Sequence, residues 1–259
     1  MSDFSGKVAV ITGAGEGIGY EIARQLVEHG ASVLLNDVDE NKAKSVASEI
    51  SPEKCIGVGG DAGQVDVVRG LVSQAVEQFG RLDIAVANAG ITLWNNFWEY
   101  KPDDFEKVLG VNLRGTFFLA QAAAKQMRSQ GDGGRILFMS SVTGHQAIEY
   151  LSAYGMTKAA LEMLAKQLTS ELAQHKITVN CVAPGATVTP RNLKDDPDYE
   201  AHWSGVTPTG NVAYPADIAN AALFLLSPVS GQITGQTIVV DGGWTRISPT
   251  PALDFVEDE

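Results

Sequence analysis

A tyrosine and a lysine lie four positions apart, at Tyr154 and Lys158. Within a helix this spacing puts both side chains on one face. A free phenol is almost fully protonated at neutral pH, but an ammonium held within a few ångströms favours the phenolate, so the pair could accept or donate a proton. Ser141, which follows a strand-like segment upstream, offers a hydroxyl that could hold a carbonyl oxygen. The same spacing also occurs on solvated helix faces, so the rest of the chain must decide between the two interpretations.

A glycine-rich turn follows the first strand-like segment, with glycines at positions 13, 15, 17 and 19. Glycines let the backbone approach a pyrophosphate, and the N-terminus of the next helix offers unpaired N–H groups and a positive dipole. The spacing differs from the common dinucleotide fingerprint, which would need a glycine in place of Ile18. A tight connection without a ligand is the alternative, but the place between a strand and a helix favours a dinucleotide.

Asp37 ends the second strand-like segment. A carboxylate there accepts hydrogen bonds from the adenosine ribose hydroxyls and repels the 2′-phosphate of NADP. No lysine or arginine occupies positions 36–38 to receive that phosphate. The alternative role, capping the helix from Glu40 onward, suits Asp39 better. Asp37 therefore predicts NAD(H) as the cofactor.

Taken in order, these motifs resemble the short-chain dehydrogenase/reductase family. The matching segments are Thr12-Gly13-Ala14-Gly15-Glu16-Gly17-Ile18-Gly19, Asn88-Ala89-Gly90, Asn112, Ser141, Tyr154 with Lys158, Pro184-Gly185 and Val240-Asp241-Gly242-Gly243. The resemblance spans almost the whole chain. Within the family, the chain is similar to NAD-dependent sugar (aldose) 1-dehydrogenases and to 3-oxoacyl reductases.

The resemblance implies a role for each catalytic residue. Tyr154 would be the acid and base, Lys158 would stabilise its phenolate and hold the nicotinamide ribose, and Ser141 would bind the substrate oxygen. Asn112 would interrupt a helix and hold a water that links Lys158 to solvent. Ser140 aligns one place too early, so we expect it to make a local backbone bond.

The same resemblance implies the cofactor contacts. Besides Tyr154 and Lys158, the expected contacts are Gly13, Gly15, Gly17, Ile18, Gly19, Asp37, Asp61, Ala62, Asn88, Ala89, Gly90, Pro184, Gly185, Thr187 and Thr189. Thr187 departs from the family pattern, which has an aliphatic residue there, but the usual contact at that position is made by the backbone.

Apolar, β-branched segments alternate with amphipathic helical patterns from end to end, which predicts one α/β domain over 1–259. We expect a doubly wound, Rossmann-type parallel sheet of about seven strands with helices on both faces, because several strands are apolar on both sides. The expected strands are 8–11, 32–36, 55–58, 84–86, 135–139, 177–182 and 237–240. The expected helices lie near 17–29, 40–50, 64–79, 102–128, 152–174 and 215–226.

The longest irregular segment, 186–214, is predicted to be a substrate lid, because long loops in compact domains are usually functional. Together with the segments after Gly90 and Ser141, it would supply the substrate contacts. The candidates are Trp94, Trp98, His145, Gln146, Glu149, Asn192, His202 and Trp203. Aromatic rings with scattered polar groups suit a sugar, although each tryptophan could equally belong to the core or to a subunit contact.

The leading hypothesis is NAD-dependent oxidation of a sugar or polyol, for example of an aldose to a lactone. A 3-oxoacyl-thioester reductase is the nearest alternative, and it would prefer NADPH and a basic patch for a carrier protein. An inactive nucleotide-binding regulator is a third hypothesis, which the complete set of Asn112, Ser141, Tyr154 and Lys158 argues against.

Composition limits the partners. The 259 residues carry a net charge of −12 at pH 7, which disfavours nucleic acid and anionic membranes. The chain has no secretory signal pattern and no long apolar stretch, so a cytoplasmic location is expected. Cys55 and Cys181 are expected to be buried free thiols, and the scattered histidines imply no metal site. The resemblance implies a homotetramer, and 247–259 is expected to be an acidic tail, either solvated or packed on a neighbouring subunit.

Overall fold

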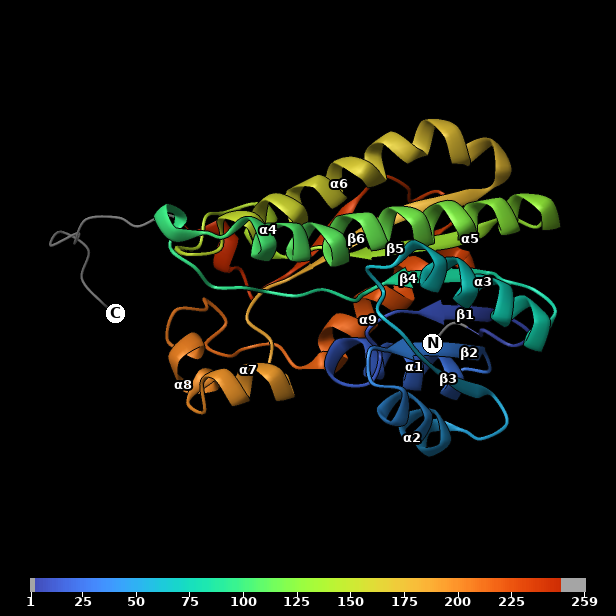
Figure 1. The fold of residues 1–259 in the computed structure, drawn as a ribbon, viewed down its shortest axis with the longest axis horizontal. Coiled ribbons are helices and arrows are strands. Elements are labelled where there is room, and N and C mark those ends of the chain that lie inside the picture. The colour runs from blue at the N-terminus through green and yellow to red at the C-terminus, as the bar shows by residue number, and fades with distance from the viewer. Residues whose placement is uncertain (1–2, 248–259) are drawn as a thin grey trace, which may run out of the picture.

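A seven-stranded parallel sheet forms the centre of the protein, which we describe from a computed structural model over residues 3–247 (Figure 1). The strand order is β3-β2-β1-β4-β5-β6-β7. The strands are β1 (Val8–Ile11), β2 (Ser32–Asp37), β3 (Cys55–Gly59), β4 (Ile84–Ala87), β5 (Gly134–Met139), β6 (Ile177–Pro184) and β7 (Thr237–Val240). The predicted doubly wound sheet is thereby confirmed, and the predicted acidic tail lies, apart from Ile247, outside the described residues.

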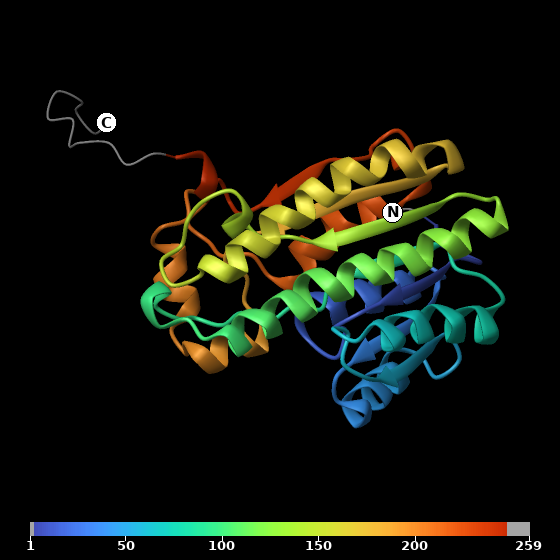
Figure 2. The ribbon, with the colours of Figure 1, turned by 45° about the horizontal axis from the view of Figure 1, so that its top comes forward.

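Helices cover both faces of the sheet, because successive strand residues point to opposite sides. In β1, Ala9 and Ile11 face one core, whereas Val8 and Val10 face the other. The first core is covered by α1 (Gly17–Glu28), α2 (Glu40–Ile50) and α9 (Pro215–Leu226). The second is covered by α3 (Val65–Phe79), α5 (Thr116–Gln130) and α6 (Ser152–Leu172), and Figure 2 shows the long α5 and α6 running side by side over the sheet.

The order of the strands reverses beside β1, and this reversal positions the site. From β1 the chain moves outward through β2 and β3, and then returns to pair β4 with the other edge of β1. The connections that follow β1 and β4 therefore leave toward opposite faces, which opens a crevice at the carboxyl ends of these strands. The glycine-rich turn follows β1, and Asn88-Ala89-Gly90 follows β4, so both border the crevice.

The predicted helical region 102–128 is not one regular helix. It consists of α4 (Pro102–Leu109), a π-helical turn (Gly110–Gly115) that contains Asn112, and α5. A π-turn inserts extra backbone into an α-helix, and such turns are frequent at functional sites. The structure thus contains the interruption that the family resemblance implied at Asn112.

The segment 186–214 is partly helical, which corrects its description as irregular. It contains α7 (Pro190–Asp195) and α8 (Tyr199–Ser204). The side chain of Thr189 accepts a hydrogen bond from the backbone N–H of Asn192, and Pro190 occupies the first turn. A threonine cap followed by proline is a common start of a helix, and this signal was present in the sequence.

Both cysteines are buried and free, as predicted. Burial raises the pKa of Cys55 and the pKa of Cys181 to about 12, so neither thiol ionises readily near neutral pH. Over residues 3–247, the helices are all too short or too polar to cross a bilayer.

Candidate active site

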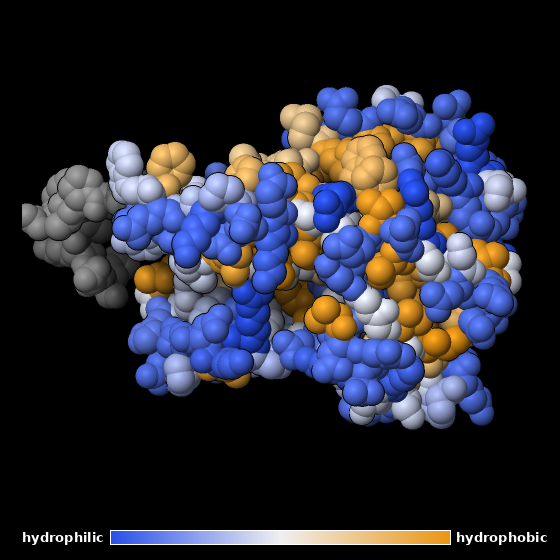
Figure 3. Space-filling model, viewed as in Figure 1, coloured by the Kyte–Doolittle hydropathy of each residue, from blue (hydrophilic) through white to orange (hydrophobic). Residues whose placement is uncertain are grey.

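A cavity of about 910 Å³ opens at the carboxyl ends of the strands. Its walls come from the turn after β1, the segments after β4 and β5, the first turns of α6, the end of β6 and the 186–214 segment. Ser141, Tyr154 and Lys158 all line this one cavity. Figure 3 shows that the outer surface of α7 and α8, at the lower left, is hydrophilic, so this segment faces solvent with polar side chains while its aromatic residues line the cavity.

Tyr154 and Lys158 occupy successive turns of α6 and approach each other. The Lys158 ammonium lies 5.3 Å from the centre of the Tyr154 ring and donates a hydrogen bond of 2.6 Å to the carbonyl of Met139, at the end of β5. Lys158 is only 3% exposed. A cation with so little water around it acts strongly on nearby charge.

Ser141 begins a single 3₁₀ turn, Val142–Gly144, immediately after β5. Its Oγ accepts a hydrogen bond of 3.2 Å from the backbone N–H of Thr143. This bond fixes the oxygen and leaves the hydroxyl hydrogen available to donate. A substrate oxygen in the cavity is therefore a suitable acceptor for Ser141.

Asn112 joins three parts of the site. Its Oδ1 accepts from the N–H of Ile91 at 2.9 Å, and its Nδ2 donates to the carbonyl of Ile91 and to Thr157 Oγ1, both at 3.1 Å. Asn112 thus links the π-turn to the segment after β4 and to α6, between Tyr154 and Lys158. A Cβ added to Gly90 would lie 3.4 Å from Lys158 Nζ and 3.5 Å from Asn112 Oδ1, so both groups converge over this glycine.

The glycine-rich turn is held in a conformation that suits a phosphate. Gly13 has a φ of +62°, and a Cβ there would come within 2.7 Å of the Ala89 backbone. The Asn88 side chain donates to the carbonyl of Gly13 at 2.7 Å, which steadies the turn from β4. At the start of α1, the side chain of Glu16 makes no capping hydrogen bond. The first N–H groups of α1 are therefore open to an anionic group.

Asp37 lies against this turn. Its carboxylate accepts hydrogen bonds from the backbone N–H groups of Gly15, at 3.2 Å, and Asp39, at 3.1 Å. Asp39 caps α2 by accepting from the N–H groups of Asn41 and Lys42, as expected. Asp61, the other acidic residue among the expected cofactor contacts, accepts from the N–H of Gly63 at 2.8 Å in the turn before α3.

Comparison with known proteins gives a consistent assignment. A family model described as enoyl-(acyl carrier protein) reductase matches residues 13–245. A short-chain dehydrogenase/reductase of Armillaria gallica is 39% identical over 250 residues, which cover 92% of this chain and 95% of that protein. The chain belongs to the short-chain dehydrogenase/reductase family.

Two further members of the short-chain dehydrogenase/reductase family differ in their named activities. An L-rhamnose 1-dehydrogenase (NAD(P)(+)) of a Sphingomonas species is 36% identical, over 94% of this chain and 98% of its own. The crystal structure of a 3-ketoacyl-(acyl-carrier-protein) reductase from Brucella melitensis, complexed with NADH, superposes with a TM-score of 0.89 at 34% identity, over 94% of this chain and 100% of its own. The protein is thus an oxidoreductase of this family, whereas these relatives leave its substrate open.

The cofactor residues implied by the short-chain dehydrogenase/reductase resemblance divide into two groups. Those that line the cavity are Gly17, Ile18, Asn88, Gly90, Tyr154, Lys158, Pro184, Gly185, Thr187 and Thr189. Those outside its lining are Gly13, Gly15, Gly19, Asp37, Asp61, Ala62 and Ala89. The glycines of the second group shape the turn from behind, because a Cβ on Gly19 would collide with Gly13 and Asn88.

Only some of the predicted substrate residues reach the cavity. Trp94, Asn192 and Trp203 line it, whereas Trp98, His145, Gln146, Glu149 and His202 lie outside its lining. Their side chains have other surroundings: Trp98 is 87% exposed and Glu149 is also exposed. Gln146 donates to the carbonyl of Thr245 at 3.3 Å, and the His202 ring lies 2.9 Å from Asp196, whose hydrogen bond raises the pKa of His202.

Ser140 and His145 share an unexpected partner. Ser140 Oγ lies 2.7 Å from Glu162 Oε1 on α6, and 3.1 Å from the carbonyl of Lys158. His145 Nε2 lies 2.9 Å from the same carboxylate oxygen. Ser140 thus does bond a backbone carbonyl, but that carbonyl lies on α6 and is not local, because α6 packs directly behind the end of β5.

Trp203 belongs to an aromatic wall whose other members, Tyr199 and Trp244, sequence reasoning missed. The rings of Tyr199 and Trp203 have centres 5.9 Å apart, and those of Trp203 and Trp244 are 6.1 Å apart at 67°. All three residues line the cavity, and burial raises the pKa of Tyr199. The spacing of Tyr199 and Trp203, four positions apart, could have revealed one helical face.

Arg191 was also missed. It lines the cavity from α7, and its Nη2 donates to the carbonyl of Thr92 at 2.7 Å. This bond ties the 186–214 segment to the segment after β4.

Proposed function

We propose that the protein is an NAD(H)-dependent dehydrogenase of a sugar or a related polyol, for example one that oxidises an aldose at C1 to a lactone. One observation carries this proposal: a single cavity is lined by Ser141, Tyr154 and Lys158, by an aromatic wall and by the glycine-rich turn. The segment 186–214 serves as the substrate lid, because it supplies Trp203 to that wall.

The turn after β1 fits a nicotinamide dinucleotide. Gly13 and Gly19 leave no space for a Cβ, and the uncapped start of α1 offers N–H groups to a pyrophosphate. Lys158 and Thr189 line the cavity further along, where they would hold the nicotinamide half. When bound, this cofactor supplies the acceptor for the hydride of the substrate carbon.

The protein's own residues manage the proton. Tyr154, as phenolate, accepts the proton of the substrate hydroxyl during oxidation, and it returns a proton to the carbonyl oxygen in the reverse direction. The buried ammonium of Lys158 stabilises the phenolate, and the Ser141 hydroxyl donates a hydrogen bond to the substrate oxygen. Asn112 holds the segment after β4 against α6. We also retain the prediction that it holds a water beside Lys158.

The preference for NAD rests on Asp37. Its carboxylate lies at the end of β2, against Gly15, where an adenosine ribose would approach the turn. Lys42, the first cation beyond it in the sequence, is ion-paired with Glu16. A 2′-phosphate at this place would therefore meet the negative charge of Asp37, while the charge of Lys42 is already balanced by Glu16.

The nature of the cavity supports a neutral, hydroxylated substrate. Aromatic rings bind the C–H faces of sugar rings, and Thr92, Asn95 and Asn192 line the same cavity with polar groups. Asp195 and Asp196 also border it, which disfavours an anionic substrate. An L-rhamnose 1-dehydrogenase among the relatives is consistent with this substrate class.

A 3-oxoacyl-thioester reductase is the second candidate, which the similarity to the Brucella melitensis enzyme favours. A panel of L-rhamnose and other aldoses, polyols and 3-oxoacyl thioesters, assayed with both NAD(H) and NADP(H), separates the two. We expect aldose-dependent formation of NADH. Turnover of thioesters alone, or faster turnover with NADP than with NAD at equal concentration, would overturn the proposal.

We also propose that the protein forms a homotetramer in the cytoplasm. Large apolar side chains are exposed on the outer side of α5 and α6, where Phe117 is 43%, Met156 47% and Met163 53% exposed. Phe224 on α9 is 47% exposed, which supports a second contact surface. Light scattering after gel filtration tests this assembly, and a monomeric mass would contradict it.

A further inference from the structure

A buried carboxylate lies behind Ser141, one helical turn beyond Lys158. Glu162 is 8% exposed. Its Oε1 is 2.7 Å from Ser140 Oγ and 2.9 Å from His145 Nε2. A carboxylate removed from water in this way requires hydrogen-bonding partners, so these two contacts define its role in the fold.

The two partners enclose Ser141 in the chain, because Ser140 precedes it directly and His145 follows the short turn after it. Gly144 comes so close to the carboxylate that an added Cβ would lie 3.1 Å from Glu162 Oε1. Lys158 adds a further link, from Nζ to the carbonyl of Met139. The segment that carries Ser141 is therefore fastened to α6 on both sides of the serine.

We propose that Glu162 is a positioning residue for catalysis, which sets the position of Ser141 relative to Tyr154. It acts through Ser140 and His145 and touches no reacting atom. The hydroxyls of Ser141 and Tyr154 must reach the same substrate oxygen, but they belong to different elements, β5 with its following turn and α6. A misplacement of about 1 Å in such a site can lower the rate by about 10²-fold. This inference rests on the roles proposed above for Ser141 and Tyr154.

The chemistry of the groups around Glu162 favours contacts that persist when His145 changes its charge. Imidazole donates through Nε2–H in one neutral tautomer and also when it is protonated, so His145 can hold the carboxylate in either charge state. The hydroxyl of Ser140 can donate to the Glu162 carboxylate whether His145 is neutral or protonated. A glutamine at position 162 would keep one acceptor oxygen, whereas an alanine would keep none.

The first test compares Glu162→Ala and Glu162→Gln with Glu171→Ala, which removes an exposed glutamate from the same helix. The measurements are kcat and KM for the best substrate of the panel, and the Kd of NADH from fluorescence titration. We expect kcat of Glu162→Ala to fall about 10- to 100-fold, with a Kd of NADH within about twofold of wild type. Glu162→Gln should recover most of the lost turnover, and Glu171→Ala should match wild type.

The second test uses His145, which is solvent-exposed on one side, so its replacement need not disturb folding. His145→Ala should increase amide hydrogen exchange over residues 140–146 and lower kcat, whereas His145→Gln, which keeps an N–H donor, should restore both. If Glu162→Ala does not fold, these two His145 variants still test the positioning role of Glu162. The hydrogen-exchange measurement needs no substrate.

The inference is overturned if Glu162→Ala and His145→Ala keep kcat and exchange at wild-type levels, or if the glutamine variants are as impaired as the alanine variants. Tyr154→Phe separates this failure from that of the proposed function. If Tyr154→Phe loses turnover but Glu162→Ala keeps it, only the positioning role of Glu162 is overturned. If Tyr154→Phe keeps full turnover, the proposed mechanism itself is overturned.

Discussion

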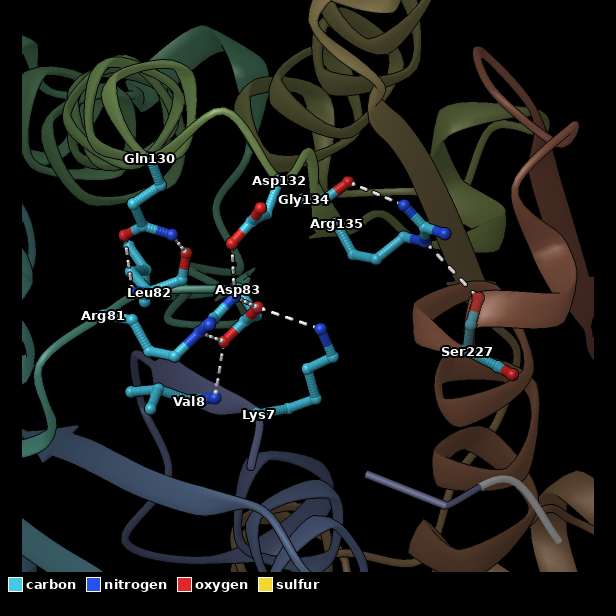
Figure 4. Close-up of polar contacts among 10 residues, drawn as sticks. All are labelled: Lys7, Val8, Arg81, Leu82, Asp83, Gln130, Asp132, Gly134, Arg135 and Ser227. Atoms are coloured by element: carbon cyan, nitrogen blue, oxygen red, sulfur yellow. Dashed lines mark hydrogen bonds and ion pairs between the residues drawn. The ribbon is translucent and has the colours of Figure 1, made fainter. Parts of the chain in front are cut away.

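The two ends of the same sheet carry polar clusters with opposite properties. At the amino ends, Asp83 precedes β4 and is 5% exposed. It accepts hydrogen bonds from the N–H of Val8 at 3.0 Å, from Arg81 at 2.7 and 2.8 Å and from Lys7 at 3.2 Å, and Figure 4 shows these groups converging on its carboxylate. Gln130 pairs with both backbone groups of Leu82. This cluster is satisfied by its own partners.

At the carboxyl ends, the polar atoms of Ser141 and Tyr154 face a cavity. Lys158 has a carbonyl partner but is paired with no carboxylate among the described residues, so its charge remains available to act on a neighbour. The amino ends thus carry a closed polar network suited to stability, whereas the carboxyl ends carry the candidate active site proposed above. Changes at the two ends should therefore affect different measurements.

The largest effect is expected from Tyr154→Phe. Loss of the phenolic hydroxyl should lower kcat by about 10²-fold or more, because the proposed general acid and base is removed. The Kd of NADH and the thermal midpoint should change little, since the ring remains. Steady-state kinetics and calorimetry check this, and near-full turnover would exclude Tyr154 from the mechanism.

Asp83→Ala should have the opposite profile. Removing a buried carboxylate leaves Arg81 and the N–H of Val8 without their partner, which should lower the free energy of unfolding by about 2–3 kcal/mol. The kcat at a temperature where the variant is folded should remain within about twofold of wild type. Urea unfolding and kinetics measure the two quantities, and Glu53→Ala, at an exposed turn position, is a suitable control. A large loss of kcat would show that the two ends are coupled.

Asp37→Ser should change the choice of cofactor rather than the rate. Removing the negative charge beside Gly15 should raise the ratio of kcat/KM for NADP over NAD by about 10-fold, equivalent to roughly 1.4 kcal/mol of repulsion removed. Kinetics with both cofactors test this expectation. An unchanged ratio would mean that the 2′-phosphate does not approach Asp37.

The smallest effect concerns acid stability. Burial alone would raise the pKa of Asp83, but hydrogen bonds from Arg81, Val8 and Lys7 outweigh it and hold the pKa below its usual value. The unfolded state then binds the proton more readily, so the stabilisation is present above a pH of about 4 and is lost as the pH falls below it. Thermal midpoints between about pH 5 and 3 should fall more steeply for wild type than for Asp83→Asn. Equal slopes would assign acid sensitivity to other groups.

Much of the fold, and the proximity of several residues in the candidate site, could be predicted, because local patterns encode them. The strands are short apolar runs separated by helices, and Tyr154 and Lys158 lie close because they share one helix. The glycine-rich turn is recognisable because Gly13 has no space for a Cβ, and this constraint is visible as residue type.

The remainder depends on long-range packing. His145 has a residue type that suits substrate binding, but Glu162 binds it from α6, and no local pattern connects the two. Trp203 and Trp244 lie 41 positions apart in the chain (244 − 203), yet they share one wall. Likewise, Arg81 meets Asp132 only because β4 and β5 are neighbours.

The π-turn at Gly110–Gly115 sets a constraint on helical phase. Each residue of an α-helix advances the side chain direction by about 100°. A deletion of one residue within this turn would allow α4 and α5 to join as a regular helix, but it would rotate Asn112 away from Ile91 and Thr157, which it now contacts. The length of the π-turn is therefore as restricted as the identity of Asn112. Insertions and deletions should be tolerated only outside Gly110–Gly115.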